Sequence, residues 1–363
     1  MKIAIDVETT NVEKVGHGIY VWNLVRELQK LGQHQYLLLA PSREKQSRLG
    51  LRTPQRFLWD LFVFPWRAWR SGATLLHQPA FSVPIFFPGK RVVTVHDLIP
   101  IYFGKDISLP SRLFLGKWVP FTFRFADHLI AISEATKQDL IATLRVPEEK
   151  ITVIPEAADE HYHPVTDKRK LRAVQRQYGL RTPYLLHIGT INPRKNLEFL
   201  VRVFAKLSQE FPDLQLVITG KKGWYYEGLF RLVDELKLND RVVFTGYIKE
   251  ENKPALLSGA SVYTFPSVYE GFGLPALEAM ACGTPVVASN TSSIPEVTGK
   301  AALLVSPHDE QGWIEAIRRI LTDKKLAGRL RKEGLLQAKK FSWRKAAEET
   351  LRVYEKVIRG ESS

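Results

Sequence analysis

Two successive series of short apolar runs, separated by amphipathic stretches, constrain this fold more than any other feature. The first series predicts strands at 2–7, 36–40, 91–95, 128–132 and 151–154. The second predicts strands at 184–188, 214–219, 241–245, 261–265 and 284–288, with helices at 197–211 and 226–236. Strands that alternate with helices favour a parallel sheet covered on both faces. We therefore expect an α/β protein with two doubly wound, Rossmann-like domains facing a central cleft.

The segment 160–182 is polar and charged, and we interpret it as the crossing between these domains. This places an N-terminal domain at 1–165 and a C-terminal domain at 166–342. A chain of 363 residues with 45% hydrophobic residues is long enough for two such cores. The single cysteine, Cys282, excludes a disulfide framework and a cysteine-based zinc cluster.

The formal net charge of +14 indicates an anionic partner without identifying it. Nucleic acid, a phospholipid surface and a diphosphate substrate are all compatible with this charge. Two segments, 43–70 and 112–124, interleave Arg and Lys with Phe and Trp, a pattern typical of contact with an anionic membrane. The alternative is an ordinary amphipathic helix whose aromatic residues face the core.

No apolar run reaches the ~18 residues of a membrane span, and the chain shows no secretory pattern. We expect a soluble cytoplasmic protein, and the two segments make the inner face of the membrane a candidate surface for it.

A glycine-rich loop at 266–273, between a strand and a helix, predicts a ligand site. Glycines at 271 and 273 allow close approach of the backbone, and the helix start favours negative groups. Glu270 in the loop and Glu278 in the expected first helical turn are carboxylates that suit the hydroxyl groups of a sugar nucleotide. The alternative is that the glycines serve only the turn and Glu278 only the helix start.

Ser267–Ser289 contains Glu-Gly-Phe-Gly-Leu-Pro, Glu-Ala-Met-Ala and Gly-Thr-Pro-Val-Val-Ala-Ser, and it resembles the signature of the family 4 retaining glycosyltransferases of GT-B fold. The motifs at 96–100, 189–196 and 220–224 are most similar to the mannosyltransferase B-like branch. The resemblance covers nearly the whole chain. It implies that Glu270 contacts the donor sugar, that Glu278 holds the ribose, and that the last helix, from about 343 to 363, packs back on the first domain.

The resemblance makes the backbone beside Glu270 part of the donor site. The residues concerned are Gly271, Phe272, Gly273 and Leu274.

Arg194 and Lys195 follow an apolar strand and precede a helix, a position that suits binding of a diphosphate. Charge-assisted hydrogen bonds contribute ~1.5–3 kcal/mol each and strengthen as the leaving nucleotide gains charge. Many members of the family have arginine directly after the glycine, whereas this chain has Thr190. We therefore expect Arg194 to carry more of the stabilisation here.

Gly16 and Gly18 lie between the first strand and the first helix, where phosphate-binding turns occur. They are not the dinucleotide fingerprint, because Val21 occupies the place of the third glycine. The resemblance brings this loop near the donor diphosphate and the acceptor, while His17 equally suits a solvent-facing position. His96 ends another apolar strand, so its ring is expected to bind a sugar hydroxyl and its carbonyl to face the anomeric carbon.

The sequence contains no Asp-x-Asp motif and no histidine pair at metal-ligand spacing. We expect no metal cofactor, and catalysis that depends on Glu270, His96, Arg194 and Lys195. The expected reaction is retaining transfer of a hexose, first mannose from GDP-mannose, to a hydroxyl of a glycan or lipid-linked acceptor. A UDP-glucose or other UDP-hexose donor remains open. A nucleotide-sugar epimerase, a sugar phosphorylase and a basic nucleic-acid-binding protein are the more distant alternatives.

Overall fold

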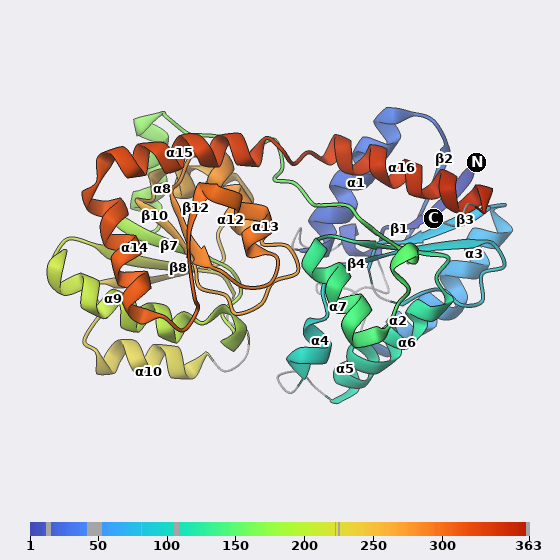
Figure 1. The fold of residues 1–363 in the computed structure, drawn as a ribbon, viewed down its shortest axis with the longest axis horizontal. Coiled ribbons are helices and arrows are strands. Elements are labelled where there is room, and N and C mark those ends of the chain that lie inside the picture. Colours follow the sequence, from blue (N-terminus) through green and yellow to red (C-terminus); the bar gives the residue numbers. More distant parts are fainter. Residues whose placement is uncertain are drawn as a thin grey trace. The chain divides into compact units, whose positions relative to one another are not determined.

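The computed structural model divides the chain into two compact units, shown in Figure 1. The structure describes residues 1–11, 16–41, 53–80, 82–104, 109–221, 223 and 226–360. Unit 1 comprises Met1–Glu156 and Ser342–Ser363, and unit 2 comprises Ala157–Phe341. Residues 157–165, which the sequence analysis assigned to the first domain, belong to unit 2, because Tyr162 and Val165 pack into its core.

Unit 1 is built on a parallel six-stranded sheet with the order β2-β1-β3-β4-β5-β6. Its strands are β1 Lys2–Asp6, β2 Gln35–Leu39, β3 Leu75–Gln78, β4 Lys90–Val95, β5 His128–Ala131 and β6 Ile151–Val153. Its longer helices are α1 His17–Leu31, α2 Thr53–Leu58, α3 Phe64–Arg70, α5 Leu109–Leu113, α7 Glu134–Leu144 and α16 Trp343–Arg359. The short helices α4 Ile99–Tyr102 and α6 Val119–Thr122 lie beside a π-helical turn, Phe114–Trp118. Because β2 and β3 lie on opposite sides of β1, the winding direction reverses at β1.

The last helix, α16, packs against α1 and completes unit 1 (Figure 1). The ring of Trp343 meets Tyr20 of α1 edge to face, with centroids 5.6 Å apart. At the other end of the contact, the hydroxyl of Tyr354 lies 2.6 Å from His77 Nδ1 in β3. His77 Nε2 lies 2.9 Å from the hydroxyl of Thr94 in β4, which also pairs with the Tyr20 hydroxyl at 3.1 Å. A buried hydrogen-bond chain therefore joins α16 to the central strands.

Unit 2 contains a second parallel six-stranded sheet with the order β12-β11-β10-β7-β8-β9. Its strands are β7 Tyr184–Ile188, β8 Gln215–Thr219, β9 Val242–Gly246, β10 Val262–Phe265, β11 Val286–Ser289 and β12 Ala302–Val305. The chain winds from β7 to β8 and β9, then returns to the other side of β7 to form β10. β7 and β10 are therefore the switch point of this sheet, where α/β proteins bind ligands beyond the carboxyl ends of the strands.

The strands of unit 2 are buried on both faces because helices cover both. Leu185 and Leu216 pack into one apolar cluster, whereas their neighbours Leu186 and Val217 pack into another. Successive strand residues point to opposite faces, so both clusters draw on the same strands. The helices are α8 Lys168–Gln177, α9 Leu197–Glu210, α10 Glu227–Glu235, α11 Lys253–Gly259, α12 Leu274–Ala281, α13 Ile294–Thr298, α14 Glu310–Thr322 and α15 Lys324–Ala338.

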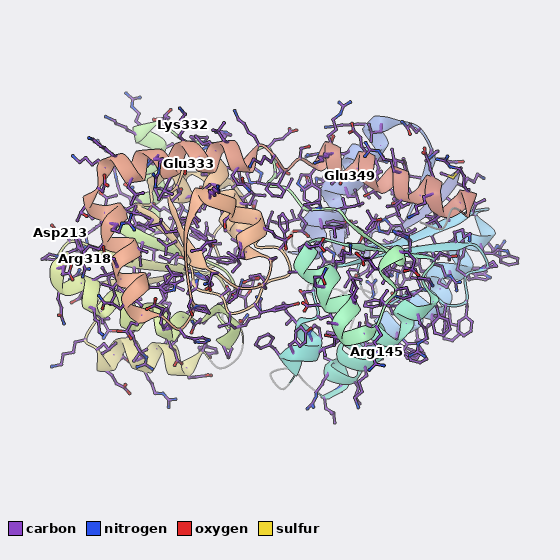
Figure 2. All side chains as sticks on the ribbon, in the orientation of Figure 1. Arg145, Asp213, Arg318, Lys332, Glu333 and Glu349 are labelled. Carbon is purple, nitrogen blue, oxygen red and sulfur yellow. The ribbon has the colours of Figure 1, made fainter. Side chains whose placement is uncertain are left out.

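Charged side chains occupy the outward faces of these helices. Figure 2 shows Arg318 of α14 and Lys332 and Glu333 of α15 pointing away from the sheet. The two-domain α/β class expected from the alternation is therefore confirmed, with apolar residues between the layers and charges outside.

The aromatic residues of the two basic segments divide between core and surface. In 53–70, Trp59 and Phe64 are buried in unit 1, whereas Phe62, Trp66 and Trp69 are exposed. Residues 43–52 of the first segment lie outside the described residues. In the second segment, Phe114 and Phe123 are buried and Phe121 is exposed. The core interpretation therefore holds for the buried aromatic residues, and membrane contact of the exposed ones stays a prediction.

The described helices fall short of what a membrane span requires. Within the ranges that the structure covers, none of them combines the length and the apolar character that crossing a bilayer needs.

Candidate active site

Two loops at the switch point of unit 2 bring three of the predicted residues together. β7 and β10 are adjacent and parallel, so their carboxyl ends lie at the same edge of the sheet. Arg194 and Lys195 lie in a 3-10 turn, Pro193–Lys195, in the loop after β7. Glu270 lies in the loop after β10, and the amide of Val268 donates to the carbonyl of Arg194 at 3.0 Å. The two loops are therefore held against each other through their backbones.

Each carboxylate oxygen of Glu270 contacts one of the two cations. Arg194 Nη1 lies 2.7 Å from Glu270 Oε2, and Lys195 Nζ lies 2.6 Å from Glu270 Oε1. Arg194 Nη1 also donates to the carbonyl of Tyr269. The Lys195 ammonium lies 5.1 Å from the centre of the Phe265 ring, within the range of a cation–π contact. These contacts leave one net positive charge in a largely buried cluster.

The electrostatics of Glu270 follow from this pairing. Burial by itself raises the pKa of the carboxyl, but Lys195 and then Arg194 outweigh it and lower the pKa to about 2. Glu270 is therefore ionised throughout the neutral range, and it accepts hydrogen bonds but donates none.

Two serine side chains form hydrogen bonds with the backbone of the Glu270 loop. The amide of Glu270 donates to Ser292 Oγ at 2.9 Å, and Ser293 Oγ donates to the carbonyls of Glu270 and Phe272 at 2.9 and 2.8 Å. Ser292 has a positive φ of 47°, which a non-glycine residue rarely adopts. Neither serine was predicted from the sequence. The available signal was the hydroxyl-rich run at 291–293 between a strand and a helix.

The remaining loop residues lead into α12. Gly271 and Phe272 are buried, and the Phe272 ring packs edge to face on Phe341 with centroids 5.7 Å apart. Gly273 caps α12 with φ 107°, a conformation that L side chains rarely adopt, and Leu274 is the first helical residue. The expected loop and helix start are confirmed. The positive φ shows that Gly273 serves the turn, and close approach of a ligand to this backbone stays a prediction.

Glu278 lies in a different set of contacts from Glu270, and it lies in the second turn of α12 rather than the first. Its carboxyl is buried beside Tyr162, Lys253 and Glu250. The Tyr162 hydroxyl donates to Glu250 Oε1, and Lys253 Nζ lies 2.6 Å from Glu250 Oε2. Burial raises the pKa of Glu278 to about 7; Lys253 opposes this shift and Glu250 adds to it. The fully buried Tyr263 lies near both carboxylates, since Glu278 and Glu270 both raise the pKa of its hydroxyl.

A third loop of unit 2, at 220–223, is hydrogen-bonded through its backbone to the loop at 189–196. The amide of Ile191 donates to the carbonyl of Lys221, and the amide of Gly223 donates to the carbonyl of Ile191, both at 3.0 Å. A Cβ at Gly220 would lie 1.9 Å from the carbonyl oxygen of Gly189, so only glycine fits there. Residues 222 and 224 of the motif at 220–224 lie outside the described residues.

His96 follows β4 in unit 1, where both of its ring nitrogens have partners. Nε2 lies 2.8 Å from the carbonyl of Pro79, and Nδ1 lies 3.2 Å from Glu156 Oε1. The carbonyl of His96, expected to face the anomeric carbon, accepts a bond of 3.3 Å from the Thr136 hydroxyl and retains a second lone pair. Glu156 was not among the site residues predicted from the sequence. Its position after a strand and a proline was the available signal.

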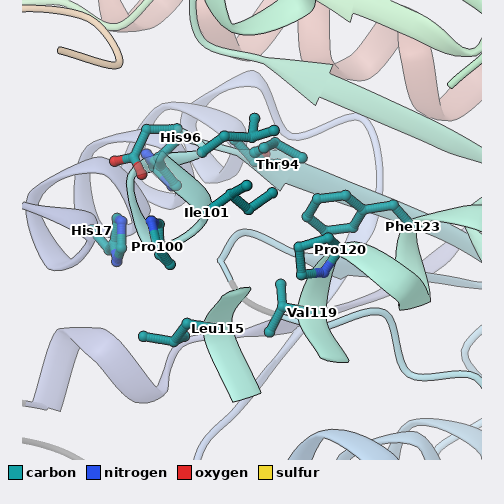
Figure 3. A pocket seen from close by; sticks show the side chains of 12 residues that line it. His17, Thr94, His96, Pro100, Ile101, Leu115, Val119, Pro120 and Phe123 are labelled. Atoms are coloured by element: carbon teal, nitrogen blue, oxygen red, sulfur yellow. The ribbon is translucent and has the colours of Figure 1, made fainter. Parts of the chain in front are cut away.

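His17, the first residue of α1, lies beside His96. The rings of His17 and His96 lie 4.3 Å apart, so His17 faces the protein and not the solvent (Figure 3). Burial, His96 and Arg56 together lower the pKa of His17 well below its usual value, which keeps its ring neutral. Gly16 caps α1 and is exposed, with φ 50°, while a Cβ at Gly18 would lie 2.7 Å from the carbonyl oxygen of Thr9. Gly18 therefore permits close packing of α1.

The chemistry of the unit 2 cluster suits an anion that carries hydroxyl groups. Arg194 and Lys195 supply N–H donors to oxygen atoms, and the Glu270 carboxylate accepts from hydroxyl groups. In the part of the chain that the structure describes, no three His, Cys, Asp or Glu side chains gather in a way that could hold a metal ion.

Comparison with known proteins identifies the family. Glycosyltransferase Family 4 matches residues 15–162, and Glycosyl transferases group 1 matches residues 169–337. O-antigen chain mannosyltransferase B of Escherichia coli is 32% identical over 288 residues, which are 77% of this chain and 74% of that protein. Serotype-specific mannosyltransferase WbdA of Escherichia coli is 30% identical over 285 residues, although these are only 34% of that longer protein. The structure of sucrose-phosphate synthase from Thermosynechococcus elongatus superimposes with a TM-score of 0.77 at 25% identity, covering 99% of this chain and 100% of that one. The chain contains two α/β units, each built on a parallel sheet, and it matches these relatives. It therefore has the GT-B fold and belongs to the family 4 glycosyltransferases.

Proposed function

We propose that this glycosyltransferase moves a hexose, with retention of configuration and without a metal ion, from a nucleoside diphosphate to a hydroxyl of a glycan or lipid-linked acceptor. The contact of Glu270 with both Arg194 and Lys195 at the switch point of unit 2 is the observation that carries this proposal. It combines a carboxylate for sugar hydroxyl groups with two cations for phosphate oxygens.

The proposed reaction occurs on one face of the sugar. The bond between the anomeric carbon and the phosphate oxygen breaks while the acceptor oxygen forms a bond on the same side, and the acceptor proton passes to the departing phosphate. Arg194 and Lys195 stabilise the charge that develops on the diphosphate. Glu270 and the backbone at Gly271 and Gly273 orient the sugar.

Outside this cluster, Glu278 binds the ribose. In unit 1, His96 binds a sugar hydroxyl. The glycine loop at Gly16 and Gly18 lies near the donor diphosphate.

Mannose from GDP-mannose is the first choice of donor, since the two Escherichia coli relatives are mannosyltransferases. UDP-glucose or another UDP-hexose is the alternative. The base would meet the backbone of residues 246–249, which follow β9 at the same edge of the sheet.

A donor panel tests the proposal. The protein is incubated in EDTA with GDP-mannose, UDP-glucose, ADP-glucose or TDP-glucose and a mixture of glycan acceptors, and nucleotide release and the anomeric configuration of the product are measured. We expect release from one nucleotide class and an axial product from an axial donor. An inverted product would contradict retention, and activity that needs added Mg²⁺ or Mn²⁺ would contradict metal independence. Turnover of none of the donors would remove the function.

We further propose that the protein works at the surface of an anionic membrane, on the cytoplasmic side. Trp66 and Trp69 are 52% and 58% exposed, and Phe86, stacked on Phe62, continues the same apolar surface. The guanidinium of Arg70 lies 5.1 Å from the centre of the Trp66 ring. Aromatic side chains next to arginine are typical of surfaces that enter the headgroup region of anionic lipids.

Sedimentation with vesicles tests the membrane contact. Trp66→Ser with Trp69→Ser should lower binding to vesicles of phosphatidylglycerol and phosphatidylcholine by about tenfold or more, given the apolar area lost. Trp22→Ser, at a tryptophan of α1 that is 46% exposed, is the matched control and should bind normally. Equal binding by all three proteins would exclude this surface.

A further inference from the structure

A small apolar pocket in unit 1 lies directly beside His96, and no function has been assigned to it so far. Its volume is about 110 Å³. His17 and His96 form one side, and Ile101, Leu115 and Phe123 form much of the rest. Figure 3 shows the two histidines on one side of the pocket and Phe123 on the other.

Several polar atoms around this pocket already have partners within the protein. The Thr94 hydroxyl pairs with His77 and Tyr20, and Asp97 Oδ1 accepts from the amide of Ile99 at 2.8 Å. Both nitrogens of His96 are paired as well. A sugar ring placed here would exchange water for a lining made mostly of apolar side chains, which disfavours a hydroxyl-rich occupant. The neutral His17 ring adds no charge for an ionic group.

The wall of the pocket is a segment with an unusual backbone. Leu115 lies in the π-helical turn Phe114–Trp118, and Val119 and Pro120 continue the wall into α6. π-helical turns occur frequently at functional sites. A Cβ at Gly116 would lie 2.9 Å from the carbonyl oxygen of Pro100, so the turn packs tightly on α4. The pocket is thus bounded by a close backbone contact and not by a loose loop.

From these observations we propose that the pocket binds a small apolar substituent of the acceptor, next to the acceptor hydroxyl that reacts. A dry cavity of 150 Å³ accommodates benzene, so 110 Å³ suits roughly four carbon atoms, about an isobutyl group. The proposal rests on the proposed function, because it takes His96 as part of the sugar-transfer site. It names the acceptor as a molecule with an apolar branch and not a uniformly hydroxylated glycan.

Two alkyl glycosides and two variants test the pocket. Methyl and isobutyl α-D-mannopyranoside are titrated calorimetrically against the full chain without donor. We expect the isobutyl glycoside to bind roughly tenfold tighter or more, the scale on which apolar pockets discriminate methylene groups. Leu115→Trp fills the pocket and should abolish this preference. Leu336→Trp, at an exposed leucine of α15, is the matched control and should retain it.

Folding of the Leu115→Trp protein is checked in unit 1, which contains Leu115, by comparing its near-ultraviolet circular dichroism and thermal unfolding with those of the wild type. Should that variant fail to fold, Leu115→Ala enlarges the pocket and should shift the preference towards a cyclohexylmethyl glycoside. Equal affinity of the wild type for the methyl and isobutyl glycosides, a preference that survives Leu115→Trp, or an unshifted preference in Leu115→Ala would overturn the proposal.

The two proposals fail differently. If every nucleotide sugar is left intact while the isobutyl preference depends on Leu115, the transfer function falls, the apolar site stands, and the occupant is no acceptor. If transfer proceeds with equal KM values for both glycosides, the function stands and the pocket proposal falls.

Discussion

Replacing Glu270 with glutamine removes the negative charge between Arg194 and Lys195 with almost no change in shape. The carboxyl has its pKa lowered from 4.5 to about 2 in the folded protein. Since each pKa unit corresponds to about 1.4 kcal/mol, the ionised carboxylate stabilises the fold by ~3 kcal/mol at neutral pH relative to a neutral group. This stabilisation is complete above pH 4.5, the unfolded value, and is lost as the pH falls towards 2. Glu270→Gln should therefore lose ~3 kcal/mol at pH 7.

Thermal unfolding at several pH values measures this loss. For a unit of this size, ~3 kcal/mol corresponds to a fall in Tm of about 6–12 °C. Glu210→Gln is the matched control, because it removes a carboxylate from the solvent-exposed pair with Arg318 and should change the Tm far less. Pyrophosphate should stabilise Glu270→Gln more than the wild type, because it can pair with the two cations that glutamine leaves without a counter-charge.

The result that would refute this reasoning is a Tm of Glu270→Gln within about 2 °C of the wild type at pH 7. A difference that stays constant between pH 7 and pH 3 would refute it as well. In the proposed reaction, Glu270→Ala should abolish transfer, because the donor sugar loses its carboxylate contact. The ion pairs show why transfer must be assayed at a temperature where the variant remains folded.

Three further predictions concern other parts of the fold. The pKa of Glu278 is about 7 in the folded protein and 4.5 in the unfolded protein, so its contribution to stability is lost as the pH rises through 7. Affinity for GDP or UDP should show the opposite trend and fall as the pH drops through 7. Glu278→Gln should flatten the pH dependence of both the Tm and the nucleotide affinity, measured by melting and titration. Gly220→Ala should abolish soluble expression because its Cβ meets a carbonyl oxygen at 1.9 Å, whereas Gly328→Ala, in open space on α15, should raise the Tm slightly. Tyr354→Phe leaves a buried nitrogen of His77 without its partner and should cost ~1–3 kcal/mol in urea unfolding.

The sequence predicted the strands that carry the site more reliably than those at other positions. β7 and β10 are continuous apolar runs before glycine-rich loops, so periodicity and turn residues indicate them together. β3, with the sequence Leu-Leu-His-Gln, and β12 were missed, because four residues with no flanking alternation carry too weak a signal. The order of the strands depends on crossovers between distant segments, which local patterns do not encode.

Some residues of the site were predicted from the sequence and others were not. Arg194, Lys195 and Glu270 were predicted together, because each follows a strand at the same edge of one sheet. The partners of Glu278 and of His96 were not, because Tyr162 and Glu156 are brought there by the path of the chain and not by any motif.

The return of α16 to unit 1 has a consequence for biosynthesis. Unit 2 is one continuous stretch, Ala157–Phe341, whereas unit 1 needs the residues after 341 to cover α1 and to reach His77. Domains generally fold as units as the chain leaves the ribosome. The second unit can therefore finish folding while the first still waits, with an apolar face of α1 uncovered, for the final helix to emerge. Nascent chains that stall before that point would expose this face to chaperones.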